Sequence, residues 1–395
     1  MNLEKEFPRL TIFFQPIIST STKELFGVEA LLRGFDEENK IVSAPTLFEL
    51  CITQARLEYL SNKAIELALK GFQMLKEIYP NVLLFLNIEP SLIDNKWESF
   101  KEILLDTQIE NSSIVLEIKE ESIDNHENLA QFCQFFKEKG FFIALDDFGS
   151  GCSNFERINS IKPDVIKLDR SLVHNFHKDV VHQEIVKAIS NMAYSLGSAV
   201  LAEGVETVED VVDARLRGIT LFQGFLFDKP MATIEKKSYK SFIDDIEQLV
   251  SSDRVTLMKQ RKQQFEHAKN IAHTICHTLE NLLDDTDIIT YIAPLLEKHQ
   301  ELEAFYILDV EGKQIGETAI RTDINPFYLP APNHYDHSSK EYFVVAKESQ
   351  NGEYLSRRYI SQASGNLCKT YVHRFINSDE TKYVCIDFKT DIKEI

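Results

Sequence analysis

The 395-residue chain lacks the features of membrane and secreted proteins. No apolar run approaches the ~20 residues that a membrane-spanning helix needs. The first residues, MNLEKEFPRL, contain no basic start followed by an apolar stretch, so they do not form a secretory signal. We therefore expect a cytoplasmic protein with no membrane partner.

Basic residues are fewer than acidic residues. Lys and Arg number 43 against 62 Asp and Glu, which gives a formal net charge of −19. Binding to a nucleic-acid polymer or an anionic membrane needs clustered Lys and Arg, so both partners are disfavoured. A solvated acidic surface explains most of this charge, and metal ligands can account for part of it.

The chain has few cysteines, and no two of them stand at a paired spacing. The six cysteines form no CxxC motif, so we predict reduced, mostly buried thiols. Internal repeats and low-complexity segments are missing as well. With 44% hydrophobic and 27% charged residues, the composition is that of a globular protein, and the length allows two domains.

What the first 232 residues do contain is a series of eight short apolar runs, most of them separated by enough sequence for a helix. Amphipathic stretches such as 44–70, 129–139 and 180–196 alternate with these runs. Such alternation predicts an α/β domain with a parallel sheet, here a (β/α)8-type barrel. The expected strands are Ile12–Pro16, Leu25–Glu29, Leu83–Asn87, Ser113–Glu117, Phe142–Asp147, Val165–Asp169, Ala199–Glu203 and Thr220–Gly224.

Acidic or amide residues stand where five of these runs give way to polar sequence: Glu29, Asn87, Glu117, the pair Asp146–Asp147, and Glu203. A single strand-end Asp is often only a helix N-cap. Five such positions in one barrel instead indicate a catalytic ring at the carboxyl ends of the strands. Oxygen ligands without a His cluster favour Mg²⁺ or Mn²⁺, and adjacent aspartates need a cation between them. We expect metal-dependent chemistry on an anionic substrate.

The pattern changes after Pro230. Residues 234–300 lack glycine and carry apolar residues at helical spacing, namely Phe242, Ile246, Leu249, Val255 and Leu257. We assign residues 233–300 to long connecting helices, with a break near Asp284–Asp287. Residues 301–395 then form a small antiparallel sheet. Its expected strands are Ala304–Asp309, Gln314–Ile320, Tyr342–Ala346, Tyr354–Ser361, Leu367–Phe375 and Lys382–Phe388.

The motifs of residues 8–232 closely resemble those of the EAL-domain cyclic di-GMP phosphodiesterases. The signature lies in Val28-Glu29-Ala30-Leu31-Leu32-Arg33. The further motifs, in order, are Asn87, Glu117-Ile118-Lys119-Glu120, Asp146-Asp147-Phe148-Gly149-Ser150-Gly151, Ile166-Lys167-Leu168-Asp169, Ala202-Glu203-Gly204-Val205-Glu206-Thr207 and Gln223-Gly224-Phe225. So many motifs in one order make the resemblance highly specific.

The resemblance implies hydrolysis of one phosphodiester of cyclic di-GMP to linear pGpG with two Mg²⁺ or Mn²⁺ ions. By motif, Glu29, Asn87, Glu117 and Asp146 would hold the first ion, Asp146 would bridge, and Asp147 would help bind the second. Glu203 would be the general base beside the attacking water, and Lys167 would steady that water or the developing charge.

Supporting roles follow from the same resemblance. Arg33 would contact a phosphate, and Gln15 and Gln223 would face the ligand or the site. Glu120 would anchor the loop after Asp147, and Glu206 would be a second supporting acid. The plainer alternative for such residues is a helix cap or a surface salt bridge.

Several positions depart from the family pattern. Gly34 stands where an aromatic residue is usual, Cys152 ends a loop that usually ends in Tyr, and Lys119 replaces Thr. None of these changes removes a predicted metal ligand or the base, so they bear on affinity more than on competence. The alternative functions are a non-catalytic cyclic di-GMP receptor and a signalling scaffold.

The C-terminal region resembles PAS-like or Cache-like sensory modules through Tyr306–Asp309 with Gly312, and through Tyr359–Ser361 with Thr370. This implies regulation of the barrel by a small ligand that the sequence does not identify. Asp336–His337 and Arg357–Arg358 are candidates to line a pocket for a small anion or amino acid, although such residues are more often surface charges. The apolar stripe of residues 242–257 favours a homodimer over a helix packed on its own domain.

Overall fold

The computed structural model describes residues 9–51, 53–95, 97–119, 126–151, 155–280, 294–321, 329–377 and 379–390. Two compact units divide the chain, Met1–Ser252 and Asp253–Ile395. Glu120, Cys152 and the predicted helix break near Asp284–Asp287 lie outside the described residues. The part of the chain that is described holds no helix both long and apolar enough to cross a bilayer.

The first unit is a closed barrel of eight strands, as predicted. Around the barrel the strands follow the order β1, β9, β8, β7, β6, β5, β4, β2 and back to β1, while β3 (Ile41–Ser43) adds to β2 outside the ring. The barrel strands are β1 (Arg9–Ser19), β2 (Glu24–Phe35), β4 (Leu83–Asn87), β5 (Ile114–Lys119), β6 (Phe142–Phe148), β7 (Val165–Leu168), β8 (Ala199–Ala202) and β9 (Leu221–Phe222).

The direction of β1 corrects the expectation of a parallel sheet. β1 runs antiparallel to both of its neighbours, β2 and β9. Only residues 20–23 connect β1 to β2, whereas a parallel pair needs a crossover of a dozen or more residues. Lys23, with φ of 62°, closes this short turn in the left-handed region.

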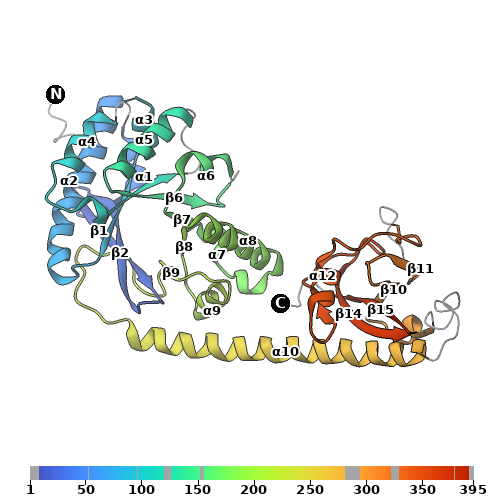
Figure 1. Cartoon of the computed structure of the whole chain (residues 1–395). Helices are drawn as coiled ribbons and strands as arrows, with labels where there is room; N and C mark the ends of the chain where they lie inside the picture. Colours follow the sequence, from blue (N-terminus) through green and yellow to red (C-terminus); the bar gives the residue numbers. More distant parts are fainter. Residues whose placement is uncertain are drawn as a thin grey trace. The chain divides into compact units, whose positions relative to one another are not determined.

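Helices surround the strands (Figure 1), and their apolar faces join the outer side of the barrel in one large core. The predicted stretch 180–196 is α8 (Val180–Leu196), but 44–70 divides into α1 (Ala44–Glu49) and α2 (Gln54–Ile78). The remaining helices are α3 (Pro90–Asn95), α4 (Glu98–Leu105), α5 (His126–Glu138), α6 (Phe155–Ile161), α7 (Arg170–Val173) and α9 (Val208–Leu216).

A separate apolar layer fills the inside of the barrel. Seven strands each contribute one buried or nearly buried residue to it: Ile17, Phe85, Val115, Ala144, Val165, Leu201 and Leu221. On β2 the corresponding position is Gly27, where a side chain would collide with the ring of Phe85. Since side chains two residues apart share a face of a strand, the next residues on this face form one polar layer directly above the apolar one.

The second unit is a six-stranded antiparallel sheet with helices. Its strand order is β11 (Gln314–Ile320), β10 (Leu302–Leu308), β15 (Glu380–Lys389), β14 (Leu367–Asn377) and β12 (Glu353–Leu355), with β13 (Tyr359–Ile360) also pairing with β14. The antiparallel sheet is as predicted, but the predicted strand Tyr354–Ser361 is two short strands. The PAS-like or Cache-like assignment stays a prediction.

The predicted strand Tyr342–Ala346 is wrong, because this run lies in helix α12 (Glu341–Glu348). Tyr342, Phe343 and Ala346 are buried, while Val344 and Val345 are largely exposed. Burial at positions i, i+1 and i+4 is the pattern of one helix face, which a short apolar run does not distinguish from a strand.

In the predicted connecting segment, α10 (Lys240–Glu280) is a helix of 41 residues, and residues 294–298 are also helical. Its first turns bury Ile243, Ile246 and Val250 in the core of the first unit. Leu249 and Val255 are each half exposed, so the predicted apolar stripe is only partly buried.

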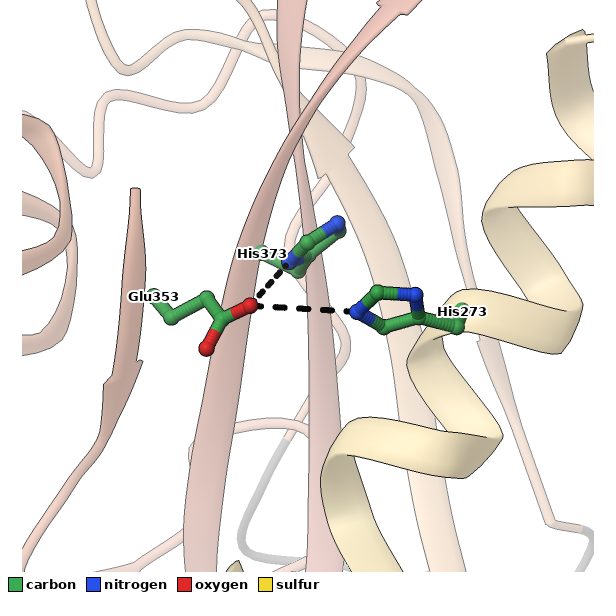
Figure 2. A group of neighbouring side chains, drawn as sticks. All are labelled: His273, Glu353 and His373. Carbon is green, nitrogen blue, oxygen red and sulfur yellow. Dashed lines mark ion pairs between the residues drawn. The ribbon is translucent and has the colours of Figure 1, made fainter. Parts of the chain in front are cut away.

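Later turns of α10 belong to the second unit and pack on its sheet through residues such as Ile271 and Ile275. Polar contacts add to this packing. Lys269 Nζ lies 2.9 Å from Glu353 of β12, and His273 and His373 lie within 3.8 Å of the same carboxylate (Figure 2).

Five of the six cysteines lie in the described part of the chain, and all five are free thiols. Four of them are buried: Cys133, Cys276, Cys368 and Cys385.

Candidate active site

The polar layer at the barrel mouth brings together most of the predicted site residues. Each of them stands two residues along the strand from the apolar layer, so the fold alone aims it into the barrel. The residues placed in this way are Gln15, Glu29, Asn87, Glu117, Asp146, Lys167, Glu203 and Gln223.

Lys167 occupies the centre of this layer with a side chain that is only 1% exposed. Its ammonium nitrogen lies 2.5 Å from Glu117 Oε1, 2.7 Å from Glu203 Oε1 and 2.8 Å from Asp146 Oδ1. Glu29 Oε2 is farther away, at 3.8 Å. One cation thus draws together carboxylates from three strands, β2, β5 and β6, and from the residue after β8.

Amide side chains complete the surroundings of Glu29. Asn87 Nδ2 donates to Glu29 Oε1 at 2.8 Å, and Gln223 Nε2 donates to Glu29 Oε2 at 2.6 Å. Gln15 stands opposite Glu29 in the strand register and accepts from Gln223 at 3.2 Å. Gln15 and Gln223 therefore belong to the site, and they hold Glu29 in position.

Asp146 and Asp147 lie together despite being adjacent in a strand. Neighbouring side chains of an extended strand point to opposite faces. Here Asp147 has φ of 55°, and the register of β6 with β7 shifts between Leu145 and Phe148. As a result, oxygen atoms of Asp146, Asp147 and Glu203 lie within 4.8 Å of one another. Three carboxylates so close together form a candidate cation site.

Charge is unbalanced in this layer, because three buried carboxylates and that of the partly buried Glu203 surround a single ammonium group. Burial, with the nearby acids, raises the pKa of Glu117 well above its usual value and that of Glu203 to about 8. For Lys167 the surrounding carboxylates outweigh burial and raise the pKa. Additional positive charge would relieve this repulsion.

The donor set fits a hard divalent cation. It consists of carboxylate and amide oxygens, the ligands that Mg²⁺ and Mn²⁺ prefer. Glu117 Oε2 is buried and has no hydrogen-bond partner among the described residues, as expected for an atom that awaits a ligand. Such a centre can activate a water and stabilise charge on a phosphate.

Arg33 and Lys119 lie beside the polar layer. Arg33 is half-buried, four residues beyond Glu29 on β2, and its Nη1 donates to the carbonyl of Leu32 at 2.8 Å. Lys119 Nζ lies 3.2 Å from Asp147 Oδ2, with both side chains partly exposed. The sequence marked Lys119 only as a departure, and its pairing with a predicted metal ligand was not foreseen.

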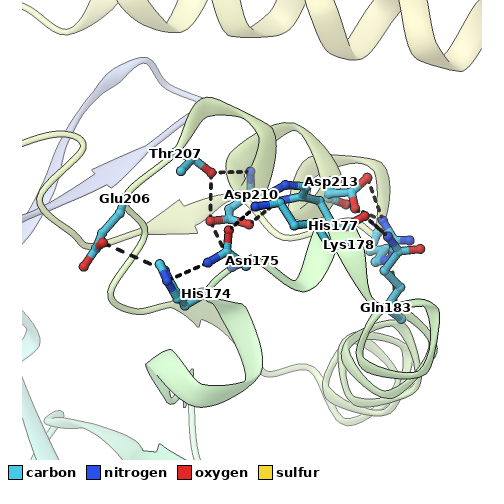
Figure 3. Close-up of polar contacts among 10 residues, drawn as sticks. His174, Asn175, His177, Lys178, Gln183, Glu206, Thr207, Asp210 and Asp213 are labelled. Atoms are coloured by element: carbon cyan, nitrogen blue, oxygen red, sulfur yellow. Dashed lines mark hydrogen bonds and ion pairs between the residues drawn. The ribbon is translucent and has the colours of Figure 1, made fainter.

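Glu206 lies away from the carboxylate cluster, in the loop after β8. Its carboxylate accepts from Arg170 at 2.8 Å. It also lies 3.9 Å from His174 Nδ1 (Figure 3). Both partners belong to the segment after β7, so Glu206 ties that segment to the loop of Glu203. The structure therefore places Glu206 in a supporting contact and does not join it to Lys167. The predicted role of Glu120 stays untested, because Glu120 lies outside the described residues.

Behind this contact lies Asp210, which is completely buried and was not identified from the sequence. It accepts from the hydroxyl of Thr207 at 2.8 Å, lies 2.7 Å from His177 Nδ1, and accepts from the backbone of Asn175 (Figure 3). Thr207 caps α9 and accepts from the Asp210 backbone. The Thr-x-x-Asp spacing is a capping signal that predicts this local contact.

Comparison with known proteins places this site in a family. The family model "EAL domain" matches residues 3–230, more than half of the chain. The chain belongs to the EAL-domain family. Its predicted signature Glu29-Ala30-Leu31 lies on β2 at the barrel mouth.

Two relatives match different shares of the chain. An EAL-domain protein of Bacillus subtilis, YkuI, described as uncharacterized, is 24% identical over 386 residues, covering 95% of this chain and 93% of YkuI. The Escherichia coli cyclic di-GMP phosphodiesterase PdeR is 29% identical over 248 residues, which is 61% of this chain but only 37% of PdeR. Much of PdeR therefore has no counterpart in the matched region.

Solved structures agree with the fold of both units. YkuI, crystallised with its substrate c-di-GMP and calcium, matches 99% of this chain with a TM-score of 0.81 at 23% identity, and 98% of YkuI is covered. A manganese and cyclic di-GMP complex of Klebsiella pneumoniae BlrP1 matches 56% of each chain with a TM-score of 0.51 at 26% identity. The YkuI match includes the C-terminal unit and shows its fold.

Proposed function

We propose that this protein hydrolyses one phosphodiester bond of cyclic di-GMP and releases linear pGpG, using two Mg²⁺ or Mn²⁺ ions. Support comes from the carboxylates of Glu29, Glu117, Asp146 and Glu203 around Lys167 and from Asp147 beside Asp146, which are the acids that the proposed two-metal chemistry uses. The name of PdeR, a cyclic di-GMP phosphodiesterase, supports the same substrate.

In this proposal Glu29, Asn87, Glu117 and Asp146 would hold the first ion, and Asp146 and Asp147 would hold the second. Bound there, the cations would supply a water of lowered pKa and neutralise charge on the phosphate. Arg33, close to Glu29 on the same strand, would contact a phosphate oxygen.

Glu203 acts as the general base. Its side chain is only partly exposed, and Lys167 Nζ at 2.7 Å fixes the orientation of Oε1. Glu203 accepts the proton of the attacking water, and the ammonium of Lys167 balances the charge that develops beside it. Gln15 and Gln223 keep Glu29 in its ligand position, and Glu206 braces the loop that carries Glu203.

One observation favours a second candidate, a cyclic di-GMP receptor with little or no turnover. Lys119 already neutralises Asp147, the predicted ligand of the second ion. An ammonium group at 3.2 Å opposes a divalent cation at the same carboxylate. A protein that holds nucleotide but not the second ion would bind without cleaving.

Regulation of the barrel by the C-terminal unit is also part of the proposal, with residues 1–232 as the phosphodiesterase, 233–300 as connecting helices and 301–395 as the sensory domain. Homodimer formation through the exposed residues of α10, such as Leu249 and Val255, belongs to the same proposal.

The variant Glu203→Gln tests the catalytic role. We expect cyclic di-GMP cleavage to fall by at least about 100-fold, because the base is lost, while calorimetric binding of cyclic di-GMP changes little. Glu209→Gln, in the first turn of α9, is the matched control and keeps full activity. Equal loss of binding and cleavage would show that Glu203 is mainly a ligand. Binding without cleavage in the wild type would favour the receptor.

A further inference from the structure

Two histidines and a glutamate meet in the second unit, where α10 packs on the sheet (Figure 2). His273 belongs to α10, Glu353 to β12 and His373 to β14. One ligand atom from each of the three side chains lies within 4.8 Å of the others. A helix and two strands thus bring together side chains of the types that bind transition metals.

The register of the sheet aims Glu353 and His373 at α10. The two residues stand directly opposite each other on β12 and β14, so their side chains share one face of the sheet. On β14 the same face carries Tyr371 and Phe375, which belong to the apolar cluster with α10. His273 completes the group from the helix, with its ring centroid 4.6 Å from that of His373.

Both histidines face one oxygen atom, Glu353 Oε1. His373 Nδ1 lies 3.4 Å from this oxygen and His273 Nε2 lies 3.8 Å from it. Zinc bonds of about 2.0–2.2 Å place neighbouring ligand atoms of a tetrahedral site about 3.4 Å apart. The spacing therefore suits a single ion bound by all three side chains after small side-chain movements.

The cluster is enclosed on the side of the sheet and open on the side of the helix. The side chains of Glu353 and His373 are 10% and 14% exposed, whereas that of His273 is 53% exposed. An ion can therefore enter beside His273 and reach two ligands that the packing already holds in place.

Ion pairing alone does not account for the two histidines. Lys269 Nζ, one turn before His273 on α10, lies 2.9 Å from both oxygens of Glu353 and supplies the positive charge that one carboxylate needs. Burial would raise the pKa of Glu353, but the hydrogen bond from Lys269 outweighs burial, and the pKa falls below its usual value. Glu353 is therefore ionised, as a metal ligand must be.

The ligand types distinguish this cluster from the barrel mouth. Two imidazoles and one carboxylate form a ligand set that holds zinc in proteins, with a fourth position open to water. Imidazole nitrogens favour Zn²⁺ and its neighbours among the transition metals, whereas the oxygen ligands at the barrel mouth favour Mg²⁺ and Mn²⁺. The two sites should therefore select different ions.

We propose that His273, Glu353 and His373 bind a Zn²⁺ ion through one nitrogen of each histidine and Oε1 of the glutamate. The ion replaces the ammonium group of Lys269 at this oxygen, and water takes the fourth position. Bound there, Zn²⁺ joins α10 to two strands of the sheet and so stabilises the packing of the helix within the second unit.

Calorimetric titration of the metal-free, full-length protein with Zn²⁺, in excess Mg²⁺ to occupy the barrel mouth, measures this binding. Titration with Co²⁺ adds a spectroscopic signature, because tetrahedral Co²⁺ with imidazole ligands absorbs visible light strongly, whereas octahedral Co²⁺ with oxygen ligands absorbs weakly. We expect one Zn²⁺ per chain to bind despite the Mg²⁺, and strong absorption from Co²⁺. Neither readout requires cleavage of cyclic di-GMP, so failure of the enzyme proposal leaves this test intact.

Variants locate the ion. His273→Gln and His373→Gln should each weaken Zn²⁺ binding at least about 100-fold, because a lost ligand costs more than a lost outer partner. Lys269→Gln should instead strengthen it about tenfold, because a competing positive charge is removed. His267→Gln is the matched control and leaves the affinity unchanged, since His267 is a similarly exposed histidine of α10 that pairs with Glu301.

Melting curves check the folding of each variant. If His373→Gln does not fold, His273→Gln decides, because the half-exposed His273 can be replaced without opening the core. The proposal is overturned if the wild type binds no Zn²⁺ in excess Mg²⁺, if His273→Gln binds it like the wild type, or if His267→Gln weakens binding equally. Wild-type affinity in Lys269→Gln would contradict the displacement of its ammonium group.

Discussion

At the scale of single residues, Lys119 and Lys167 play opposite parts around the same acids. Lys167 is buried and contacts Glu117, Asp146 and Glu203, so it helps to assemble the site. Lys119 is half exposed and contacts Asp147, whose side chain is also partly exposed. An exposed ion pair of this kind contributes about 0–1 kcal/mol to stability. Removing Lys119 therefore changes the stability of the fold little, but it changes the electrostatic field at Asp147.

We predict that Lys119→Thr binds the second Mn²⁺ about tenfold more tightly, since a positive charge next to the ion is removed. Calorimetric titration of the metal-free protein with Mn²⁺ measures this directly. Lys137→Thr is the control, because Lys137 pairs with Asp164 away from the carboxylate cluster. Unchanged Mn²⁺ affinity would show that Lys119 does not oppose the ion.

The sequence predicted which residues form the site better than how they contact one another. Glu117 and Glu203 were recognisable because each stands where an apolar run gives way to polar sequence, whereas the predicted strand end at Glu29 is wrong, because β2 continues to Phe35. The strands then bring the three residues together. The pairing of Lys119 with Asp147 depends on a left-handed backbone at Asp147. A non-glycine residue gives no local signal for that conformation.

At the scale of elements, the loop after β8 is held by β9 and by the segment after β7. The backbone of Val205 bonds to Gln223, and Leu226 bonds back to Val205. Gly224 permits this close approach, because a side chain there would collide with the backbone oxygen and nitrogen of Val205. Glu203 stands two residues before Val205, so its position depends on this contact.

Gly224→Ala should lower kcat/KM for cyclic di-GMP about 100-fold, because it displaces the loop that carries Glu203. The matched control is Gly197→Ala at the end of α8, where a side chain meets no atom within 4 Å. That control costs about 1–2 kcal/mol of stability from its positive φ and leaves kcat/KM unchanged. Equal activity of both variants would contradict the proposed role of the loop contact.

Asp387 should make the stability of the second unit depend on pH. Burial raises the pKa of Asp387 to about 6, above its ordinary value near 4. Folding of the second unit is therefore favoured at low pH, where the Asp387 carboxyl group is protonated. This contribution to stability is lost as the pH rises through about 6. The shift corresponds to about 3 kcal/mol.

The effect is measured by comparing the melting temperatures of the wild type and Asp387→Asn at several pH values, because every other titratable group is present in both proteins. The wild type should lose stability relative to the variant as the pH rises from about 4 to about 7. Parallel curves would show that Asp387 is not perturbed.

The sequence distinguished helices from strands where a periodic pattern extends over many residues, but not where an apolar run is short. The 17 residues of α8 matched the predicted stretch to the residue. Tyr342–Ala346 was assigned to a strand because five apolar residues fit either period. The antiparallel direction of β1 was missed for another reason: an apolar run carries no information on its direction, which here follows from the short link to β2.

At the scale of the whole molecule, the chain joins an EAL barrel to an antiparallel sheet through the helix α10. The barrel was predictable because its motifs follow one another in a fixed order. The second unit contains a cavity whose lining was predictable only in part: His337, Arg357 and Arg358 line it, whereas Asp336 does not, and Asp387, which also lines it, was not singled out. Asp387 lies between Ile386 and Phe388 in β15, and only the folded sheet shows which face it shares.

The most direct test of the central claim is the cleavage of cyclic di-GMP by the full-length protein, followed by chromatography of the nucleotides. With Mn²⁺ or Mg²⁺ the account predicts conversion to pGpG, loss of conversion with a chelator, and recovery when metal is restored. Intact cyclic di-GMP after incubation with Mn²⁺, under conditions where a control EAL phosphodiesterase cleaves it, would contradict the account.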